Sequence, residues 1–142
     1  MLFVDADVEF KPEAVMRMLV PKKDIVCTPY RVKNEPEMME YAVKFKDSKD
    51  IKILPWDIVE IEEGPAGCML IHRRVFERLM EKRPDLKFHL DTGEWKGEDL
   101  SFCALARQEG FKIYANLDSG TTHHGSWGWK GRFGDFLIKK EK

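Results

Sequence analysis

The chain has 142 residues, of which 43% are apolar and 35% are charged, and its formal net charge is −1. This composition predicts one compact, soluble domain with a real core and excludes an intrinsically disordered chain. The near-neutral balance gives no global attraction to nucleic acid or to an anionic membrane, so a phosphate-bearing ligand would have to be held by local charge or through a metal.

The first half of the chain predicts strands around one helix. The apolar run of residues 1–4 is typical of a buried strand. Residues 12–20 have helical spacing, with a proline in the first turn and another after the end. Residues 24–28 predict the next strand. The charged segment 31–50 has a weak helical spacing, and residues 51–61 alternate as in one or two strands.

The second half predicts a regular alternation of strand and helix. Residues 64–67 are typical of a turn and residues 68–71 of a buried strand. Residues 72–82 place their apolar side chains on one helical face. A second helix is expected over 98–109, closed by a glycine, and is followed by a strand over 111–115.

The remaining segments are less regular. Residues 88–90 predict a short strand, and residues 91–97 predict a loop that carries Trp95. Residues 118–131 are rich in Gly, Ser, Thr, His and Trp, which excludes regular structure there. A short helix is expected over 133–138, within an otherwise irregular C-terminal segment, 126–142, that ends in a basic tail.

The alternation of strands and helices indicates a single α/β domain over residues 1–142, with a mixed sheet flanked by helices. The three cysteines are odd in number and lack CxxC spacing, which predicts free thiols in a reducing compartment. No apolar run approaches the ~20 residues of a membrane span, and the N-terminus does not resemble a signal peptide. We therefore expect a cytoplasmic protein with no transmembrane segment.

Two carboxylates, Asp5 and Asp7, follow the first predicted strand. Residues two apart on a strand point to the same side, and ligands of an open α/β sheet bind beyond the carboxyl ends of its strands. Such paired oxygen ligands suit Mg²⁺ or Mn²⁺, and the ion could hold a diphosphate. The alternative is a loop in which one aspartate caps the helix that begins near Pro12.

Two later pairs of residues add further polar chemistry. Glu98 and Asp99 stand at a predicted helix N-terminus, where capping explains only one of the two acids. His123 and His124 are adjacent in a glycine-rich segment with no apolar face to bury them. In a chain that already has a carboxylate pair, this pattern favours a metal ligand over a structural histidine.

Four stretches carry a resemblance to a known family. They are FVDADVEF (3–10), GPAGCMLIHRRVF (64–76), GEDLSFCALARQEGFKIY (97–114) and HHG (123–125). In this order they resemble the later part of a family 2-type glycosyltransferase of the GT-A fold. The resemblance implies an N-terminally truncated, GT-A-like domain, because such enzymes have a nucleotide-binding half ahead of the Asp-x-Asp motif.

The resemblance also implies an activity and roles for matching residues. The activity is transfer of a sugar from a nucleotide-diphosphate sugar to an acceptor hydroxyl, with inversion. Asp7 would bind the metal directly, and Asp5 would lie nearer the ribose or a metal-bound water. Asp99 matches the general base of inverting members, and Glu98 matches a neighbour that contacts the acceptor.

The remaining implied roles concern the metal, the sugar and the partners. His123 matches the late histidine that completes the metal site, with His124 as the alternative. Gly67 would line the sugar site and Trp95 would stack on an acceptor sugar. The implied cofactor is Mn²⁺ or Mg²⁺, and the acceptor is a glycan, a lipid-linked sugar, a protein or a modified nucleic acid. Without its N-terminal half, the domain is expected to self-associate through exposed strand edges, or to pair with that half.

Two other functions are compatible with parts of the sequence. An apolar strand followed by Asp-x-Asp resembles the opening of a haloacid dehalogenase-type phosphatase. That family has Gly-Thr-type residues where this chain has VEF (8–10), and it leaves both histidines unused. The other alternative is a non-catalytic sugar-binding domain or scaffold, built on the four tryptophans, although tryptophans are more often core and loop anchors. They are Trp56, Trp95, Trp127 and Trp129.

Overall fold

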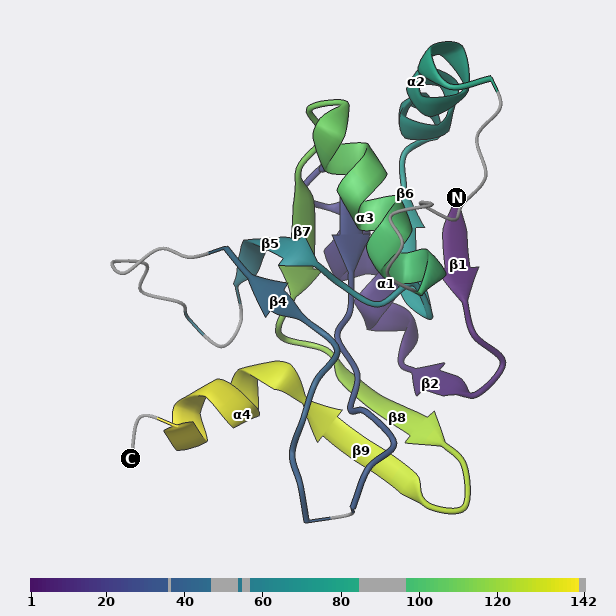
Figure 1. Cartoon of the computed structure of the whole chain (residues 1–142). Helices are drawn as coiled ribbons and strands as arrows, with labels where there is room; N and C mark the ends of the chain where they lie inside the picture. Colours follow the sequence, from purple (N-terminus) through teal and green to yellow (C-terminus); the bar gives the residue numbers. More distant parts are fainter. Residues whose placement is uncertain (36, 47–53, 55–56, 85–96, 141–142) are drawn as a thin grey trace.

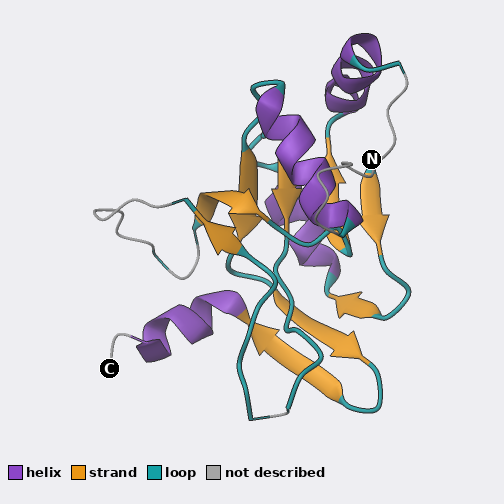
Figure 2. Cartoon of the chain, in the orientation of Figure 1, coloured by secondary structure: helices purple, strands orange, loops and turns teal. Residues whose placement is uncertain are grey.

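A computed structural model describes residues 1–35, 37–46, 54, 57–84 and 97–140. These residues form an α/β fold (Figures 1 and 2). The strands are β1 (Leu2–Val4), β2 (Val8–Phe10), β3 (Ile25–Cys27), β4 (Lys44–Phe45), β5 (Ile58–Glu63), β6 (Cys68–Ile71), β7 (Ile113–Asn116), β8 (Gly120–His124) and β9 (Gly128–Arg132). The helices are α1 (Pro12–Leu19), α2 (Arg73–Lys82), α3 (Glu98–Gln108) and α4 (Phe133–Lys140).

The strands form a six-stranded mixed sheet, in the order β1-β6-β3-β7-β5-β4, and a three-stranded sheet, in the order β2-β8-β9. In the larger sheet β3 and β7 are parallel, whereas the other neighbouring strands are antiparallel. It follows that β1, β3 and β7 run in the same direction. Their carboxyl ends meet at one edge of the sheet, which we call the carboxyl edge, together with the amino end of β6.

Alternating side chains divide the core between the two faces of the larger sheet. Ile25 and Cys27 belong to the main core cluster with residues of α2 and α3, whereas Val26 belongs to a second cluster with Met18 of α1. Figure 1 shows α3 in front of the sheet and α1 behind it. The predicted α/β fold with a mixed sheet flanked by helices is therefore confirmed.

The helix ends follow the sequence signals. Pro12 stands in the first turn of α1. The Nδ1 atom of His72 accepts a hydrogen bond from the Arg74 amide at 3.2 Å and so caps α2. Gly110, with a φ of 85°, follows the end of α3, and this left-handed conformation is favourable for glycine because it lacks a Cβ atom.

The first strand is predicted correctly, but its expected burial is wrong. The side chains of Leu2, Phe3 and Val4 are between 39% and 45% exposed. β1 is the first strand in the sheet order, and within the described residues its only sheet partner is β6. An apolar run therefore indicated a strand here without indicating its place in the sheet. Self-association through exposed strand edges stays a prediction.

The expected irregular structure near the C-terminus is also wrong. Residues 120–132 form the β8–β9 hairpin, in which Thr121 pairs with Gly131 and His123 pairs with Trp129. Segment 126–142 therefore contains β9 and the predicted final helix, α4. The weak helical spacing in 31–50 was misleading, because its described residues contain β4 and an isolated bridge between Arg31 and Tyr41.

Some sequence predictions lie outside the described residues. They are the strand at 88–90, most of the loop at 91–97 with Trp95, and the beginning of the alternating segment 51–61. None of the helices in the described part of the chain has the length and apolar character needed to cross a membrane. All three cysteines are free, as predicted, and buried.

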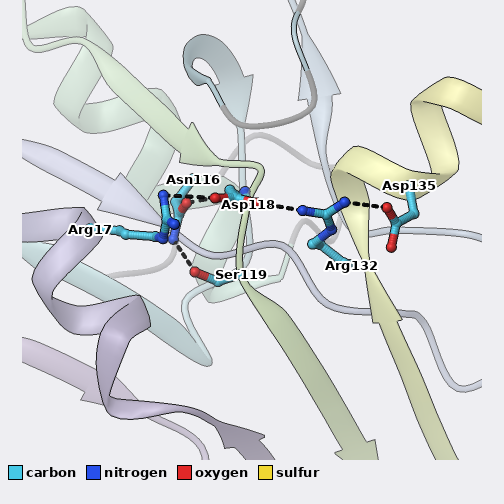
Figure 3. A network of polar contacts seen from close by, with 6 residues as sticks. All are labelled: Arg17, Asn116, Asp118, Ser119, Arg132 and Asp135. Atoms are coloured by element: carbon cyan, nitrogen blue, oxygen red, sulfur yellow. Dashed lines mark hydrogen bonds and ion pairs between the residues drawn. The ribbon is translucent and has the colours of Figure 1, made fainter.

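A network of ion pairs, which we call the Asp118 network, fixes the segment between β7 and β8 (Figure 3). Asp118 accepts from Arg17 of α1 at 2.7 Å and from Arg132 of β9 at 2.5 Å. Arg132 also pairs with Asp135 of α4. The network connects α1, the smaller sheet and α4 at the point where the chain leaves the larger sheet.

Candidate functional site

Asp5 and Asp7 lie in the tight turn that joins β1 to β2 at the carboxyl edge. The Asp5 amide donates to the Gly67 carbonyl at 3.0 Å, and the Val8 amide donates to the Asp5 carbonyl at 3.1 Å. Strand alternation therefore does not orient the two carboxylates, contrary to the sequence argument, because both follow the end of β1. Neither one caps α1, whose N-cap is Lys11 with no side-chain cap bond.

Asp7 faces a lysine and a histidine. Its Oδ2 atom lies 2.5 Å from Lys33 Nζ and 3.6 Å from His123 Nε2. The hydrogen bond from Lys33 lowers the pKa of Asp7, and the charges of Lys33 and His123 lower it further. Asp7 is therefore held as a carboxylate, which is the form that binds a cation.

His123 is held in the tautomer that a metal ligand needs. Its Nδ1 atom lies 2.8 Å from the Arg31 carbonyl oxygen, and since a carbonyl can only accept, Nδ1 carries the hydrogen. In the neutral ring the lone pair is then on Nε2, which faces Asp7. A metal-binding histidine is typically oriented by just such a bond to its other nitrogen. The His123 ring also packs edge-on against Tyr30, with centroids 4.8 Å apart.

The two adjacent histidines have different surroundings because they lie on a strand and not in the predicted loop. Successive side chains of β8 point to opposite faces. His123 pairs in register with Val8, next to Asp7. His124 instead places its Nε2 atom 2.7 Å from Glu9 and is exposed. The His124 amide donates to the Asp7 carbonyl at 2.7 Å. Of the two predicted histidine ligands, only His123 has its side chain beside the Asp7 carboxylate.

Gly67 lies where two polar side chains approach the backbone. A Cβ atom at this position would stand 2.5 Å from both Asp5 Oδ2 and the Tyr30 hydroxyl oxygen. Only glycine leaves room for this approach. The sequence argument placed Gly67 in the sugar site, and the structure places it beside Asp5.

Tyr30 and Lys33 are site residues that the sequence analysis missed. Tyr30 is buried, and its pKa is raised by burial first and then by the negative charges of Asp5 and Asp99. It therefore stays a neutral hydroxyl among carboxylates. A signal was available, because Tyr30 and Lys33 follow β3, whose carboxyl end lies at the same edge as that of β1.

Asp99 reaches the site from the first turn of α3. Its Oδ2 atom accepts a hydrogen bond from the Ala66 amide at 3.0 Å, so this acid holds the loop before β6 and does not cap its own helix. Burial raises its pKa, and the nearby charges of Glu98 and Asp5 raise it further. Asp99 is half-buried, whereas Glu98 is exposed. Asp99 is therefore a stronger base than an ordinary aspartate.

Two cavities flank Asp99. The first, of about 330 Å³, has walls of apolar side chains with Glu98 and Asp99 at its border. The second, of about 440 Å³, is more polar and is lined in part by Lys44, Glu63 and Glu98. A substrate that fills either cavity would lie next to the Asp99 carboxylate.

Asp7 and His123 could supply two ligands of a metal site whose other ligands come from a substrate and water. The described residues contain no group of three or more His, Cys, Asp and Glu side chains able to hold a metal. Asp7 Oδ2 and His123 Nε2 are 3.6 Å apart, and two ligands at right angles on an octahedral Mg²⁺ are about 3.0 Å apart. Mg²⁺ commonly binds one or two protein groups and takes its other ligands from phosphates and water. Lys33 Nζ already places a positive charge beside Asp7.

Several other candidate residues lie away from this cluster. Trp95 is outside the described residues. Trp129 is buried and donates from Nε1 to the Asn34 carbonyl at 2.9 Å. A sugar-binding surface made of all four tryptophans is therefore wrong.

Comparisons with known proteins give a likeness in fold. No protein-family model and no curated protein matches the sequence. Among solved structures, the viral protein A197 from STIV matches 88% of this chain with a TM-score of 0.54 and 23% sequence identity. This chain spans 57% of the length of A197. At this identity the likeness shows the fold alone, an α/β fold with a six-stranded mixed sheet and a three-stranded sheet.

Proposed function

We propose that this chain forms the metal- and acceptor-binding part of a glycosyltransferase, which moves a sugar from a nucleotide-diphosphate sugar to an acceptor hydroxyl with inversion. The observation that carries the proposal is the meeting of distant segments at one edge of the sheet. Asp7 and His123 face one another. Beyond the effect of burial, the charges of Asp5 and Asp99 raise the pKa of Tyr30, and the charge of Asp5 raises the pKa of Asp99.

The proposal includes a GT-A-like arrangement. Two observations support it. The Asp-x-Asp turn lies at the carboxyl edge of a mixed sheet, and Asp99 of α3 accepts a hydrogen bond from Ala66 in the loop that contacts this turn. The same motifs, in the same order, gave the family resemblance. In such an arrangement the donor diphosphate would lie by Asp7, His123 and Lys33.

The Asp99 carboxylate supplies the base. Its Oδ2 atom is held by the Ala66 amide, which leaves Oδ1 to take the proton of an acceptor hydroxyl. As that proton moves to Asp99, the acceptor oxygen forms a bond to the anomeric carbon, and the bond from that carbon to the diphosphate oxygen breaks. The leaving diphosphate keeps the electron pair. A single displacement of this kind inverts the anomeric centre.

The residues around Asp7 supply positive charge and orientation for the leaving group. A divalent ion bound there would neutralise charge that develops on the diphosphate. The Lys33 ammonium, next to Asp7, adds a second positive charge from this chain itself. The Arg31 carbonyl keeps the His123 lone pair directed at the site. Burial and the negative charges of Asp5, Asp99 and Asp7 raise the pKa of Tyr30, so it stays neutral beside these carboxylates.

Titration of Mn²⁺ into the full chain tests the proposal. Binding is followed by electron paramagnetic resonance, alone and with UDP, GDP or ADP. We expect one nucleoside diphosphate to tighten Mn²⁺ binding at least tenfold, because its phosphates complete the coordination sphere. The variant Asp7→Asn should lose this coupled binding. His124→Gln is the matched control and should retain it, because His124 pairs with Glu9 and faces away.

Two results would contradict the proposal. One is Mn²⁺ binding in Asp7→Asn that equals binding in the unmodified chain. The other is the same Mn²⁺ affinity with and without every diphosphate. Metal-dependent hydrolysis of a simple phosphate ester, with no nucleotide-sugar present, would instead favour the phosphatase alternative.

A further inference from the structure

The first cavity beside Asp99 is lined by aromatic and aliphatic side chains from four elements. Its walls are Phe3 of β1, Met69 and Ile71 of β6, Phe76 of α2 and Phe102 of α3. Phe3 and Met69 are register partners, so both stand on the face of the sheet that α2 and α3 cover. The volume of about 330 Å³ is within the range of small-molecule sites.

Three phenylalanine rings line this cavity in series. The Phe3 and Phe76 centroids are 6.0 Å apart, and the Phe76 and Phe102 centroids are 6.1 Å apart. Both pairs are tilted, with interplanar angles of 45° and 31°, so the rings are neither stacked nor edge to face. Phe3 is 39% exposed, so its ring is open to solvent. An aromatic group of a ligand can add to this series at low cost.

The cavity is bounded by the same two segments that carry the donor-side residues. Phe3 precedes Asp5 by two residues, and Ala66, which also lines the cavity, precedes Gly67. Asp99 is one of the residues that line this mainly apolar cavity, and the Asp5–Gly67 hydrogen bond lies further along the same two segments. The second cavity differs, because it has more polar surface and is lined by Lys44 and Glu63 as well as by apolar side chains.

We propose that the acceptor is an alcohol that carries an aromatic ring, with the ring in this cavity and the hydroxyl at Asp99. The assignment of the ligand as acceptor rests on the proposed function, whereas binding of the ring rests on the cavity alone. A dry cavity of about 150 Å³ can hold benzene. The larger volume here leaves room for a ring and part of the group that links it to the hydroxyl.

Binding of two matched glucosides tests this inference on the full chain, without donor or metal. Phenyl β-D-glucoside and methyl β-D-glucoside have the same sugar hydroxyls and differ in the apolar group. We expect the phenyl compound to bind at least tenfold more tightly by NMR titration, and to shift the Asp99 side-chain carboxyl resonance. Equal affinities, or an unchanged Asp99 resonance, would overturn the inference.

Variants of cavity residues then test whether the phenyl ring of the glucoside binds in this cavity. Phe3→Ser should reduce the affinity for the phenyl compound at least fivefold and leave the methyl compound unaffected. Met16→Ser is the matched control, because Met16 is an exposed apolar residue of α1 that does not line the cavity. If Phe3→Ser does not fold, Phe3→Leu keeps an apolar edge strand without the ring and should show a smaller loss. Unchanged affinity in a folded Phe3 variant would contradict the inference.

The two proposals can fail separately. If no diphosphate tightens Mn²⁺ binding, the transferase proposal is wrong, but the cavity can still be a binding site for an aromatic ring. Absence of phenyl glucoside binding, with the coupling intact, would leave a transferase with an acceptor of another class.

Discussion

Two clusters of charged residues lie near the carboxyl edge of the sheet, and they differ in how their charges are compensated. In the Asp118 network every carboxylate has a guanidinium partner, and Asp118 has two. In the candidate site, Asp5 and Asp99 have no cationic partner within the described part of the chain, and Asp99 is half-buried.

This difference separates a stabilising role from a functional one. Paired charges that bridge separate elements hold a fold together, and the network does so for α1, β9 and α4. A carboxylate whose pKa is raised by burial and by neighbouring negative charges makes folding less favourable, and such groups are common where a ligand supplies the missing positive charge. The candidate site has this second pattern, apart from Asp7, which Lys33 partly neutralises.

The largest expected effect is on catalysis by the Asp99→Asn variant. Asparagine can still accept the Ala66 hydrogen bond but cannot take a proton, so the transfer rate should fall about 10²–10⁴-fold. The free energy of unfolding should not decrease, because a half-buried charge is removed. Release of nucleoside diphosphate from a panel of nucleotide-sugars measures the rate, and urea denaturation measures stability. A rate within tenfold of the unmodified chain would exclude Asp99 as the base.

The next largest effect is on stability, in the Asp118→Ala variant. This change leaves Arg17 and Arg132 without their shared carboxylate, and we expect a loss of about 2 kcal/mol in the free energy of unfolding. Asp135→Ala is the control and should cost under about 1 kcal/mol, since its pair with Arg132 is exposed. Urea denaturation measures the stability of the Asp118→Ala variant, and Mn²⁺ titration of the folded variant measures its metal affinity. Together they distinguish a stabilising role of Asp118 from a metal-binding one. A loss of metal affinity without a loss of stability would reverse the assignment of the two clusters.

A smaller effect is expected from the two histidines. His123→Gln should weaken Mn²⁺ binding roughly tenfold, because it removes the nitrogen that faces Asp7. His124→Gln should leave the affinity unchanged within about twofold. Both are measured in the presence of the diphosphate that binds most tightly. Equal losses in the two variants would contradict the separation of these side chains by β8.

The smallest effect is on the titration of Asp99. The charge of Glu98 raises the Asp99 pKa, so Glu98→Gln should lower it. The acid limb of the transfer rate should move to lower pH, because the base stays deprotonated further into acid. The pKa of Asp99 is raised in the folded state. Its ionisation therefore lowers the free energy of unfolding as the pH rises above 3.8, the ordinary pKa of an aspartate. Glu98→Gln should reduce that cost.

Carboxyl ¹³C NMR reports this titration directly and needs no activity. Glu13→Gln, an exposed change on α1, is the matched control and should leave the Asp99 titration unchanged. An unchanged titration in Glu98→Gln would show that the charge of Glu98 does not raise the Asp99 pKa.

The sequence by itself determined the local elements of this protein and the chemistry available to it. Prolines and Gly110 set the ends of α1 and α3, and apolar runs located the strands next to them. These signals act over a few residues, so they can be interpreted without knowing the rest of the fold. The carboxylates Asp5, Asp7 and Asp99 were recognisable for the same reason, as polar residues at element ends.

The tertiary structure alone decided which of these groups meet. Strand pairing between residues far apart in the chain put β1 at an exposed position and formed the β8–β9 hairpin from a segment that lacked an apolar pattern. That hairpin separates His123 from His124, since neighbours on a strand face opposite ways. Tyr30 joins the site because β3 ends at the same edge as β1. Long-range register, unlike helix spacing, leaves little trace in a local stretch of sequence.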